Sequence, residues 1–581
     1  MAPHSPATDR TRPTPHDNLS IARAARLWPI EEIAHRLGLP GEAVEPYGRG
    51  IAKLDLGALA GLAERPRGRY VVVSAITPTP PGEGKTTTAI GLVQGLQRLG
   101  HVACVALRQP SMGPTLGLKG GATGSGYSQV LPMERINLHL TGDIHAVGAA
   151  HNLLAALVDN HLHHRLEPEL DPRTICWPRV IDLNDRALRH LVVGLGGRGD
   201  GVPRQSGFEI TAASEVMAVL ALADSLTDLR RRLGQLIVGQ DRAGEPVTAE
   251  QIGAAGAMTV LLREALKPNL LQTLEHAPAL IHAGPFGNIA HGNSSIVADR
   301  IGLHAGDFLV TEAGFGADMG AERFFNIKCR ASGLTPDAAV LVASVRALKY
   351  HSGRHRVAPG RPLPASLLAE HPEEVHEGGA NLLKQIDNIR AHGITPVVAI
   401  NAFPGDHDSE HAAIMELCAA VGVRAVLATH VRDGGKGAQA LAEALIEAIE
   451  EADQAGEGFR FLYPDELPLV AKIERIATRL YGAEGVDFAP AARQQLEAWQ
   501  RQGHGRLPVC IAKTHLSLSH DAGRLGAPTG WRLPVREVRL SAGAGFVYAL
   551  AGDILTLPGF GASPAATRLD IDEDGNTVGL Y

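Results

Sequence analysis

The sequence predicts an α/β protein whose main body is a doubly wound, mostly parallel sheet, accompanied by two smaller α/β domains. Three observations predict it: a glycine-rich loop between a strand and a helix, several short runs that are apolar on both faces, and a globular composition. The chain has 581 residues, of which 45% are hydrophobic and 20% charged, and it is too long for one core.

The glycine-rich loop lies inside a strand–helix–strand unit. Val71–Ile76 (VVVSAI) has the β-branched composition of a strand, and Thr86–Leu99 carries apolar residues at helical spacing until Gly100 ends the helix. His101–Leu107 (HVACVAL) is the next expected strand. Because such crossover connections are right-handed, we expect the two strands to be parallel and side by side.

Further buried strands are expected along the chain, because a parallel strand between two helix layers is apolar on both faces. They are Arg179–Leu183, Ala279–His282, Phe308–Thr311, Ala338–Ser344 and Pro396–Ile400. Polar stretches at 354–379 and 451–464 predict boundaries or surface loops, and 537–558 is typical of strands with tight turns.

The loop itself, Pro78–Thr86 (PTPPGEGKT), predicts phosphate binding. Its glycines let backbone N–H groups curl around phosphate oxygens, Lys85 would reach the terminal phosphates, and the Thr86 hydroxyl would ligate Mg²⁺. The loop departs from the usual G-x-x-x-x-G-K-[ST] pattern by having Thr79 at the first glycine position. The absence of an Asn-Lys-x-Asp element from 401–406 (NAFPGD) favours adenine over guanine.

These features give the expected domain organisation. A disordered leader is expected at 1–17, a P-loop NTPase-like nucleotide-binding domain at 18–370, a second α/β domain at 371–460 and a C-terminal α/β domain at 461–581.

Other polar side chains follow the predicted strands. Arg108 opens a segment rich in Gly and Pro that includes Lys119 and ends at Tyr127, and it would bind a phosphate or a carboxylate at the carboxyl edge of the sheet. Glu312 ends an apolar strand and is the expected partner of Thr86 in a magnesium site, with Asp318 as second choice.

Two further segments bring histidines together. Asp143, His145 and His151 lie close in sequence, as do His282 and His291. Their spacing matches no zinc pattern, so for these residues a polar lining and a catalytic role both stay open.

Bulk properties exclude several classes of function. A net charge of −7 and a pI near 6.4 argue against binding to nucleic acid or to an anionic membrane. No apolar run reaches the ~18 residues of a membrane helix, and the amino terminus has no apolar signal core. Five widely spaced cysteines fit a reducing compartment, so we expect a cytoplasmic protein.

From about residue 20 onwards, the chain resembles the formate–tetrahydrofolate ligases. The resemblance rests on nine blocks in the same order, and these are TPTPPGEGKTTT, GPTLGLKGGATGSGYSQVLPME, INLHLTGDIHAVGAAHNLLAAL, GFEITAASEVMAVL, LKPNLLQTLE, TEAGFGADMGAERFFNIKCR, PVVAINAFPGD, PVCIAKT and VREVRLSAGAGFVYALAGDI.

The resemblance implies that formate, ATP and tetrahydrofolate give N10-formyltetrahydrofolate, ADP and phosphate through formyl phosphate. It implies that Lys85 and Arg108 hold the transferred phosphoryl group, that Tyr127 closes this pocket and that Phe403 stacks on the pterin. It also implies Mg²⁺, leaves a dependence on a monovalent cation open, and implies a homotetramer. The ATP-binding residues by motif match are Pro78, Thr79, Pro80, Pro81, Gly82, Glu83, Gly84, Lys85 and Thr86.

Two positions depart from the family pattern. Gln109 stands where many members have Glu, which removes a charge beside the phosphoryl site, and Val431 stands where the family usually has Trp. The second change would remove one face of the pterin sandwich, at a cost on the order of 1 kcal/mol.

Two alternative functions stay open at this point. The first is a P-loop switch ATPase, although such proteins often carry an early lysine where this chain has Pro80 and Pro81. The second is a decayed family member that binds nucleotide or folate only, which the changes at Gln109 and Val431 motivate.

Overall fold

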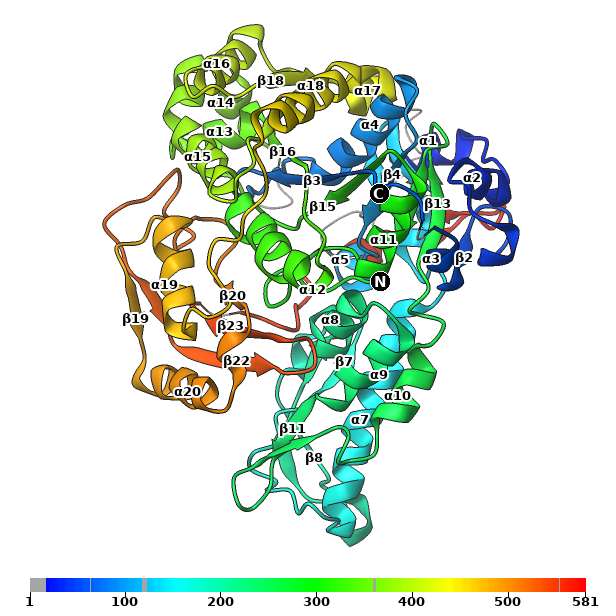
Figure 1. The fold of residues 1–581 in the computed structure, drawn as a ribbon, viewed down its shortest axis with the longest axis vertical. Coiled ribbons are helices and arrows are strands. Elements are labelled where there is room, and N and C mark those ends of the chain that lie inside the picture. The colour runs from blue at the N-terminus through cyan, green and yellow to red at the C-terminus, as the bar shows by residue number, and fades with distance from the viewer. Residues whose placement is uncertain (1–16, 63, 118–122, 359–361, 553, 581) are drawn as a thin grey trace, which may run out of the picture.

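The computed structural model describes residues 17–62, 64–117, 123–358, 362–552 and 554–580. Its centre is a mixed sheet in which 12 strands of the described residues take part (Figure 1). Seven adjacent strands are mutually parallel. In spatial order they are β14 (Pro278–Ile281), β4 (Ala103–Leu107), β15 (Phe308–Glu312), β3 (Arg69–Ala75), β16 (Ala338–Ala343), β17 (Val397–Asn401) and β18 (Ala425–Ala428).

An antiparallel group extends this sheet beyond β14. It consists of β13 (Asn269–Thr273), β2 (Ala52–Leu54), β1 (Val44–Pro46), β6 (Ser128–Leu131) and β5 (Gly124–Ser125). The prediction of a mixed α/β fold with a large, mostly parallel sheet is therefore confirmed.

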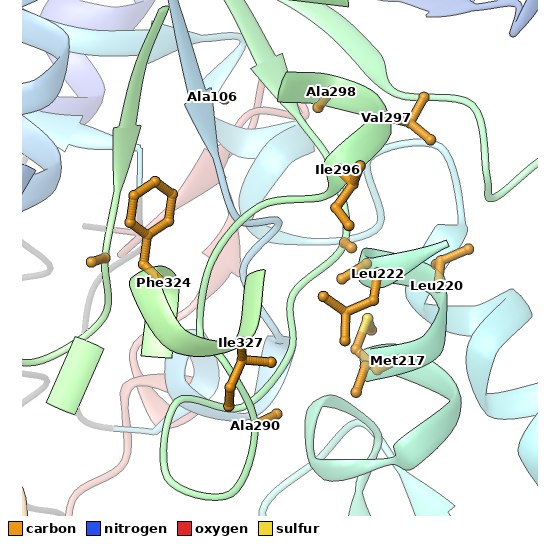
Figure 2. Packing of buried hydrophobic residues seen from close by; sticks show 14 of the residues in the cluster. Ala106, Met217, Leu220, Leu222, Ala290, Ile296, Val297, Ala298, Phe324 and Ile327 are labelled. Carbon is orange, nitrogen blue, oxygen red and sulfur yellow. The ribbon is translucent and has the colours of Figure 1, made fainter. Parts of the chain in front are cut away.

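Helices pack against both faces of the parallel strands. Side chains alternate along β3, so Tyr70 and Val72 enter one core while Val71 and Val73 enter the other. The first core is shared with α11 (Ile296–Ala305), α13 (Val345–His351) and α15 (Pro372–Arg390), and the second with α4 (Lys85–Arg98) and α18 (Gln439–Ala455). Figure 2 shows the first core where Met217 and Leu222 of α8 (Glu215–Leu222) lie near Ile296.

Two further bodies surround the sheet in Figure 1. One extends below it and contains α7 (Asp143–His164), α8, α9 (Leu226–Gly234), α10 (Ala255–Leu262), β7 (Arg179–Ile181), β8 (Leu191–Val193), β9 (Arg204–Ser206), β10 (Phe208–Ile210), β11 (Ile237–Gln240) and β12 (Pro246–Thr248). The other has its own apolar core and contains α19 (Leu469–Arg479), α20 (Pro490–Arg501), β19 (Val486–Phe488), β20 (Val509–Ala512), β21 (Leu533–Val535), β22 (Glu537–Ser541) and β23 (Phe546–Leu550).

The remaining elements are short connections. The helices are α1 (Asn18–Ala24), α2 (Ile30–Arg36), α3 (Gly57–Leu62), α5 (Met112–Leu116), α6 (Met133–Asn137), α12 (Arg330–Ser332), α14 (Ala365–Leu368), α16 (Asp408–Ala419) and α17 (His430–Asp433), and the strands are β24 (Asp570–Ile571) and β25 (Thr577–Val578). Within the described residues, no helix has the length and apolarity needed to cross a membrane.

The structure corrects three expectations. β7, expected as a strand of the main sheet, pairs only with β10 outside it. β4 does not lie beside β3, because β15 comes between them. The polar stretch 354–379 contains the start of α15, whose first turn has Pro372 at a position where its missing N–H is not needed.

The domain boundaries stay a prediction, and the structure adds two facts to them. The sheet runs across the expected boundary at 370/371, because β17 and β18 continue it from β16. The last residues leave the C-terminal body, since Leu580 packs with Leu19. Apart from Asp17, the expected leader lies outside the described residues.

A buried carboxyl group gives the fold a measurable pH dependence. Glu322 is fully buried between two π-helical turns, Ala317–Ala321 and Phe324–Cys329, and only Asn326 donates a hydrogen bond to it, at 3.0 Å. Burial raises the pKa of this carboxyl group to about 8. A carboxyl group whose pKa is raised by folding stabilises the folded protein at pH values below its unfolded-state pKa. This stabilisation is lost as the pH rises toward 8.

We therefore expect Glu322→Gln to remove this loss. Between pH 5 and 8, the free energy of unfolding of the variant should rise relative to that of the unaltered protein, by up to about 1.4 kcal/mol per pH unit. Urea unfolding at three pH values in this range measures the difference. A difference that is constant with pH would contradict the assignment.

Candidate active site

Loops from four neighbouring strands meet at one edge of the sheet. In the order β14, β4, β15 and β3, the strands are parallel, so their carboxyl ends point the same way. Thr311 pairs with Ala106 of β4, and Glu312 pairs with Val73 of β3. Glu312 therefore lies between the loop that follows β3 and Arg108, which follows β4. This edge is where ligands bind in open α/β sheets.

The glycine-rich loop has the backbone shape that phosphate binding requires. Gly82 and Gly84 have φ values of 81° and 84°, in the left-handed region that favours glycine. Gly84 caps the amino end of α4, so the first N–H groups of this helix face the loop. A Cβ atom at Gly84 would lie 2.2 Å from the Asn401 side chain, so only glycine fits.

Glu83 supports the loop from inside. Its carboxylate accepts hydrogen bonds from the Thr79 backbone N–H at 2.6 Å and from the Thr79 hydroxyl at 2.9 Å. It is buried, and its second oxygen lies 3.6 Å from Lys85 Nζ. Thr79 therefore replaces the usual first glycine with a residue that binds the loop's own carboxylate.

A buried polar network holds Thr77, where β3 passes into the loop. Asn381 accepts from the Thr77 N–H and donates to its hydroxyl, Gln385 donates to the same hydroxyl, and His351 Nε2 lies 2.9 Å from the Thr77 carbonyl. Gln385 also donates to Asp318, which forms an ion pair with Lys513 at 2.9 Å. Asp318, the second choice for magnesium, thus lies in a bridge to the C-terminal body.

Thr86 and Glu312 come together as expected for a magnesium site. The Thr86 hydroxyl donates to Glu312 Oε2 at 2.7 Å. Hydroxyl and carboxylate oxygens are ligands that Mg²⁺ accepts beside substrate phosphates and water. Among the described residues, no three His, Cys, Asp or Glu side chains gather as a metal cluster. These two oxygens therefore fit a cation that takes its other ligands from a nucleotide.

Arg108 has the surroundings of an anion-binding residue. Its guanidinium donates one hydrogen bond, to the Pro285 carbonyl at 3.3 Å, and within the described part of the chain it forms no ion pair. Burial lowers the pKa of this guanidinium, while Glu312 raises it. A Cβ atom at Gly314 would lie 3.2 Å from Arg108 Nη2, so the glycine at this position makes room for the guanidinium. A largely buried cation without a partner attracts an anionic ligand.

The histidine segments have different roles. Asp143 forms a buried ion pair with Lys53 at 2.8 Å, and His151 stacks on Trp177 and bonds Ser214, with its pKa lowered to about 4 by burial. His145 is exposed. Asp143 and His151 therefore support the fold. In the other segment His282 bonds Ser295 and the Ala265 carbonyl. His291 is buried, and in the described part of the chain neither of its ring nitrogens has a hydrogen-bond partner.

Tyr127 and Phe403 lie on segments that contact the glycine-rich loop and its helix. The Tyr127 N–H donates to the Val431 carbonyl at 2.9 Å, its carbonyl accepts from Gln94 of α4, and its side chain is 49% exposed. Phe403 follows β17 and has the Arg346 guanidinium 4.3 Å from its ring centroid. Gln109 is buried, and neither polar atom of its amide has a hydrogen-bond partner among the residues that the structure describes. Lys119 lies outside the described residues.

Sequence reasoning missed Asn401, His430 and Lys513. Asn401 donates to the Glu83 carbonyl, His430 contacts Thr88 of α4, and Lys513 binds Asp318. Asn401 and Lys513 each come at the carboxyl end of a strand, which is a signal that would have found them.

The fold and this edge define an α/β protein in which a glycine-rich loop, a carboxylate and a partly buried arginine lie side by side at the carboxyl ends of parallel strands. Residues 16–581 match the family model described as formate–tetrahydrofolate ligase. The formate–tetrahydrofolate ligase of Saccharopolyspora erythraea is 64% identical over 97% of this chain and 99% of its own length. Formate–tetrahydrofolate ligase 2 of Rubrobacter xylanophilus is 61% identical (97% and 99%), and the ligase of Cutibacterium acnes is 59% identical (97% and 100%). The chain belongs to the formate–tetrahydrofolate ligase family, and the expected resemblance is confirmed.

Because Arg108 forms no ion pair among the described residues, we expect its replacement to raise stability and to weaken anion binding. We expect Arg108→Met to raise the free energy of unfolding of the ligand-free protein by about 1 kcal/mol, because it removes a desolvated charge. The same variant should lose most of the stabilisation that phosphate gives the unaltered protein. Thermal unfolding without phosphate and with phosphate at roughly 50–100 mM measures both effects. An unchanged response to phosphate would contradict the anion site.

Proposed function

We propose that the chain is an ATP-dependent ligase that joins formate to tetrahydrofolate and gives N10-formyltetrahydrofolate, ADP and phosphate. The observation that carries the proposal is the juxtaposition of Lys85, the Thr86–Glu312 pair and the partnerless Arg108 at one sheet edge. Family membership supports the reaction. The glycine-rich loop would bind ATP, the phosphoryl donor, as the loop of a P-loop NTPase does.

The first step of the proposed reaction makes formyl phosphate. A formate oxygen attacks the γ-phosphorus, a new P–O bond forms, the bond to the β,γ-bridging oxygen breaks, and ADP leaves. Lys85 and a magnesium ion held by Thr86 and Glu312 neutralise the phosphates. Arg108 offers two parallel donors to the formate or to the transferred group. Phosphoryl transfer of this kind needs positioning and charge rather than a protein nucleophile.

The second step uses the folate amine. N10 attacks the formyl carbon, the carbon–oxygen bond to phosphate breaks, and phosphate leaves while the amine gives up a proton. We infer that the pterin lies against Phe403, whose ring is backed by Arg346. Val431 offers no aromatic face, and the exposed ring of Tyr127, whose backbone is bonded to Val431, supplies one instead.

The remaining parts of the proposal follow the family. ATP with Mg²⁺ is the nucleotide substrate, a monovalent cation is an open dependence, the assembly is a homotetramer, and the compartment is the cytoplasm. The decayed-relative alternative draws support only from Gln109 and Val431. The neutral amide of Gln109 adds no second negative charge beside Glu312, and Arg108 forms no ion pair among the described residues, so its guanidinium stays available to an anion.

The test of the proposal is a formate-dependent assay. Protein with formate, MgATP and tetrahydrofolate should give a product that acid converts to the absorbing methenyl form. Lys85→Ala should lower turnover by at least a hundredfold, on the order of 3 kcal/mol of transition-state stabilisation, and leave the Kd for tetrahydrofolate within about threefold.

Each outcome has a definite reading. Formate-independent hydrolysis without methenyl product would favour the switch ATPase. Folate binding without turnover would favour the decayed relative. A Lys85→Ala variant that lost folate affinity but kept turnover would contradict the assignment of Lys85.

A further inference from the structure

Two connections run from the phosphate loop to residues next to Phe403 and Val431, the residues that mark the two walls of the proposed folate site. One connection is direct, through Asn401, and the other passes from His430 through Thr88. Asn401 lies two residues before Phe403, and its Nδ2 atom donates to the Glu83 carbonyl at 3.0 Å. His430 lies one residue before Val431, and its ring contacts Thr88 of α4, whose hydroxyl donates to the Gly84 carbonyl at 2.9 Å. Glu83 and Gly84 are consecutive, so both connections end on the same turn of the loop.

The hydrogen bonds fix which atom of His430 is the donor. Thr88 has one hydroxyl proton, and it is directed to Gly84. The contact of 3.3 Å between Thr88 Oγ1 and His430 Nε2 therefore requires the imidazole to donate from Nε2. Nδ1 is then the unprotonated nitrogen, and no group of the described residues bonds it. The ring is fully buried, and burial lowers its pKa to about 4, so this neutral form persists at physiological pH.

Close packing leaves these connections little freedom. A Cβ atom at Gly84 would lie 2.2 Å from Asn401 Nδ2, and one at Gly91 of α4 would lie 2.5 Å from the His430 Cβ atom. A Cβ at Gly435 would lie 2.8 Å from Gln94 of the same helix. In Figure 1, α17, which begins at His430, accordingly lies beside α4. A shift of the loop or of α4 must therefore move the segments that carry Phe403 and Val431.

We propose that Asn401 and His430 are positioning residues that couple occupancy of the phosphate loop to the two walls of the folate site. This inference rests on the proposed function, which places the pterin between Phe403 and the segment of Val431 and Tyr127. A nucleotide that orders the Glu83–Gly84 turn then changes the affinity for tetrahydrofolate, and tetrahydrofolate changes the affinity for the nucleotide by the same factor.

The coupling factor is the readout. We would measure the Kd of the full-length protein for tetrahydrofolate without nucleotide and with saturating MgADP, and the Kd for MgADP with and without tetrahydrofolate. In the unaltered protein we expect a change of at least fivefold, equal in both directions. Thr88→Val and Asn401→Leu are near-isosteric and each break one connection, so each should reduce the factor at least twofold. His430→Phe keeps an aromatic ring but removes the Nε2 donor, so its coupling factor should resemble that of Thr88→Val.

His351→Phe is the matched control. His351 is also a buried histidine that bonds the loop region, through the Thr77 carbonyl at 2.9 Å. It shares α13 with Arg346, which backs Phe403, but among the described residues its own ring bonds neither the segment of Phe403 nor that of Val431. We expect it to weaken MgADP binding while the coupling factor keeps its unaltered value. A circular-dichroism spectrum and a cooperative thermal transition for each variant establish that it is folded.

The inference is overturned if the unaltered protein shows a factor below twofold, or if the Thr88 and Asn401 variants keep the full factor. It is equally overturned if His351→Phe loses the factor as they do, since any loop contact would then suffice. Failure of the proposed function is a separate result, because it would appear as absence of formate-dependent product from the unaltered protein.

Discussion

The parallel register of β4, β15 and β3 is the constraint on which the site depends. Pairing of Thr311 with Ala106 and of Glu312 with Val73 brings the ends of three strands to one level. The glycine-rich loop and Arg108 follow β3 and β4, and Glu312 is the last residue of β15. The sheet thus places a phosphate-binding turn, a carboxylate and a guanidinium side by side before any ligand arrives. Arranging charge in advance is what phosphoryl transfer needs most.

The surrounding polar groups explain how the loop keeps its shape. Glu83 accepts hydrogen bonds from Thr79 within the loop. The network around Thr77 connects the loop through Gln385 and Asp318 to Lys513. Asn401 donates to the Glu83 carbonyl. In contrast, Arg108 has no carboxylate partner among the described residues. The molecule therefore satisfies the groups that position the loop, and it leaves without an ion pair the guanidinium that we propose meets the substrate. Such a division is expected where binding energy is directed to a ligand.

Local patterns were enough to predict the glycine-rich loop, the helix after it, six of the seven parallel strands of the main sheet and the pairing of Thr86 with Glu312. Strand order was beyond such patterns, because the position of β15 between β3 and β4 depends on which helix layers close over which strands. The same limit applies to Asp318, whose carboxylate pairs with a lysine 195 residues away in sequence. The position of Asn401 at the end of β17 was a signal for a site residue, but its bond to the Glu83 carbonyl has no signature in sequence, and neither has the contact of His430 with Thr88.

The most direct test follows one oxygen atom through the reaction. If formate attacks the γ-phosphorus and N10 then displaces phosphate from the formyl carbon, one formate oxygen stays with phosphorus. Turnover with ¹⁸O-labelled formate, MgATP and tetrahydrofolate should therefore give inorganic phosphate that carries one ¹⁸O atom per molecule, as measured by mass spectrometry or by the isotope shift in ³¹P NMR. Phosphate without label, formed together with formyltetrahydrofolate, would contradict the account.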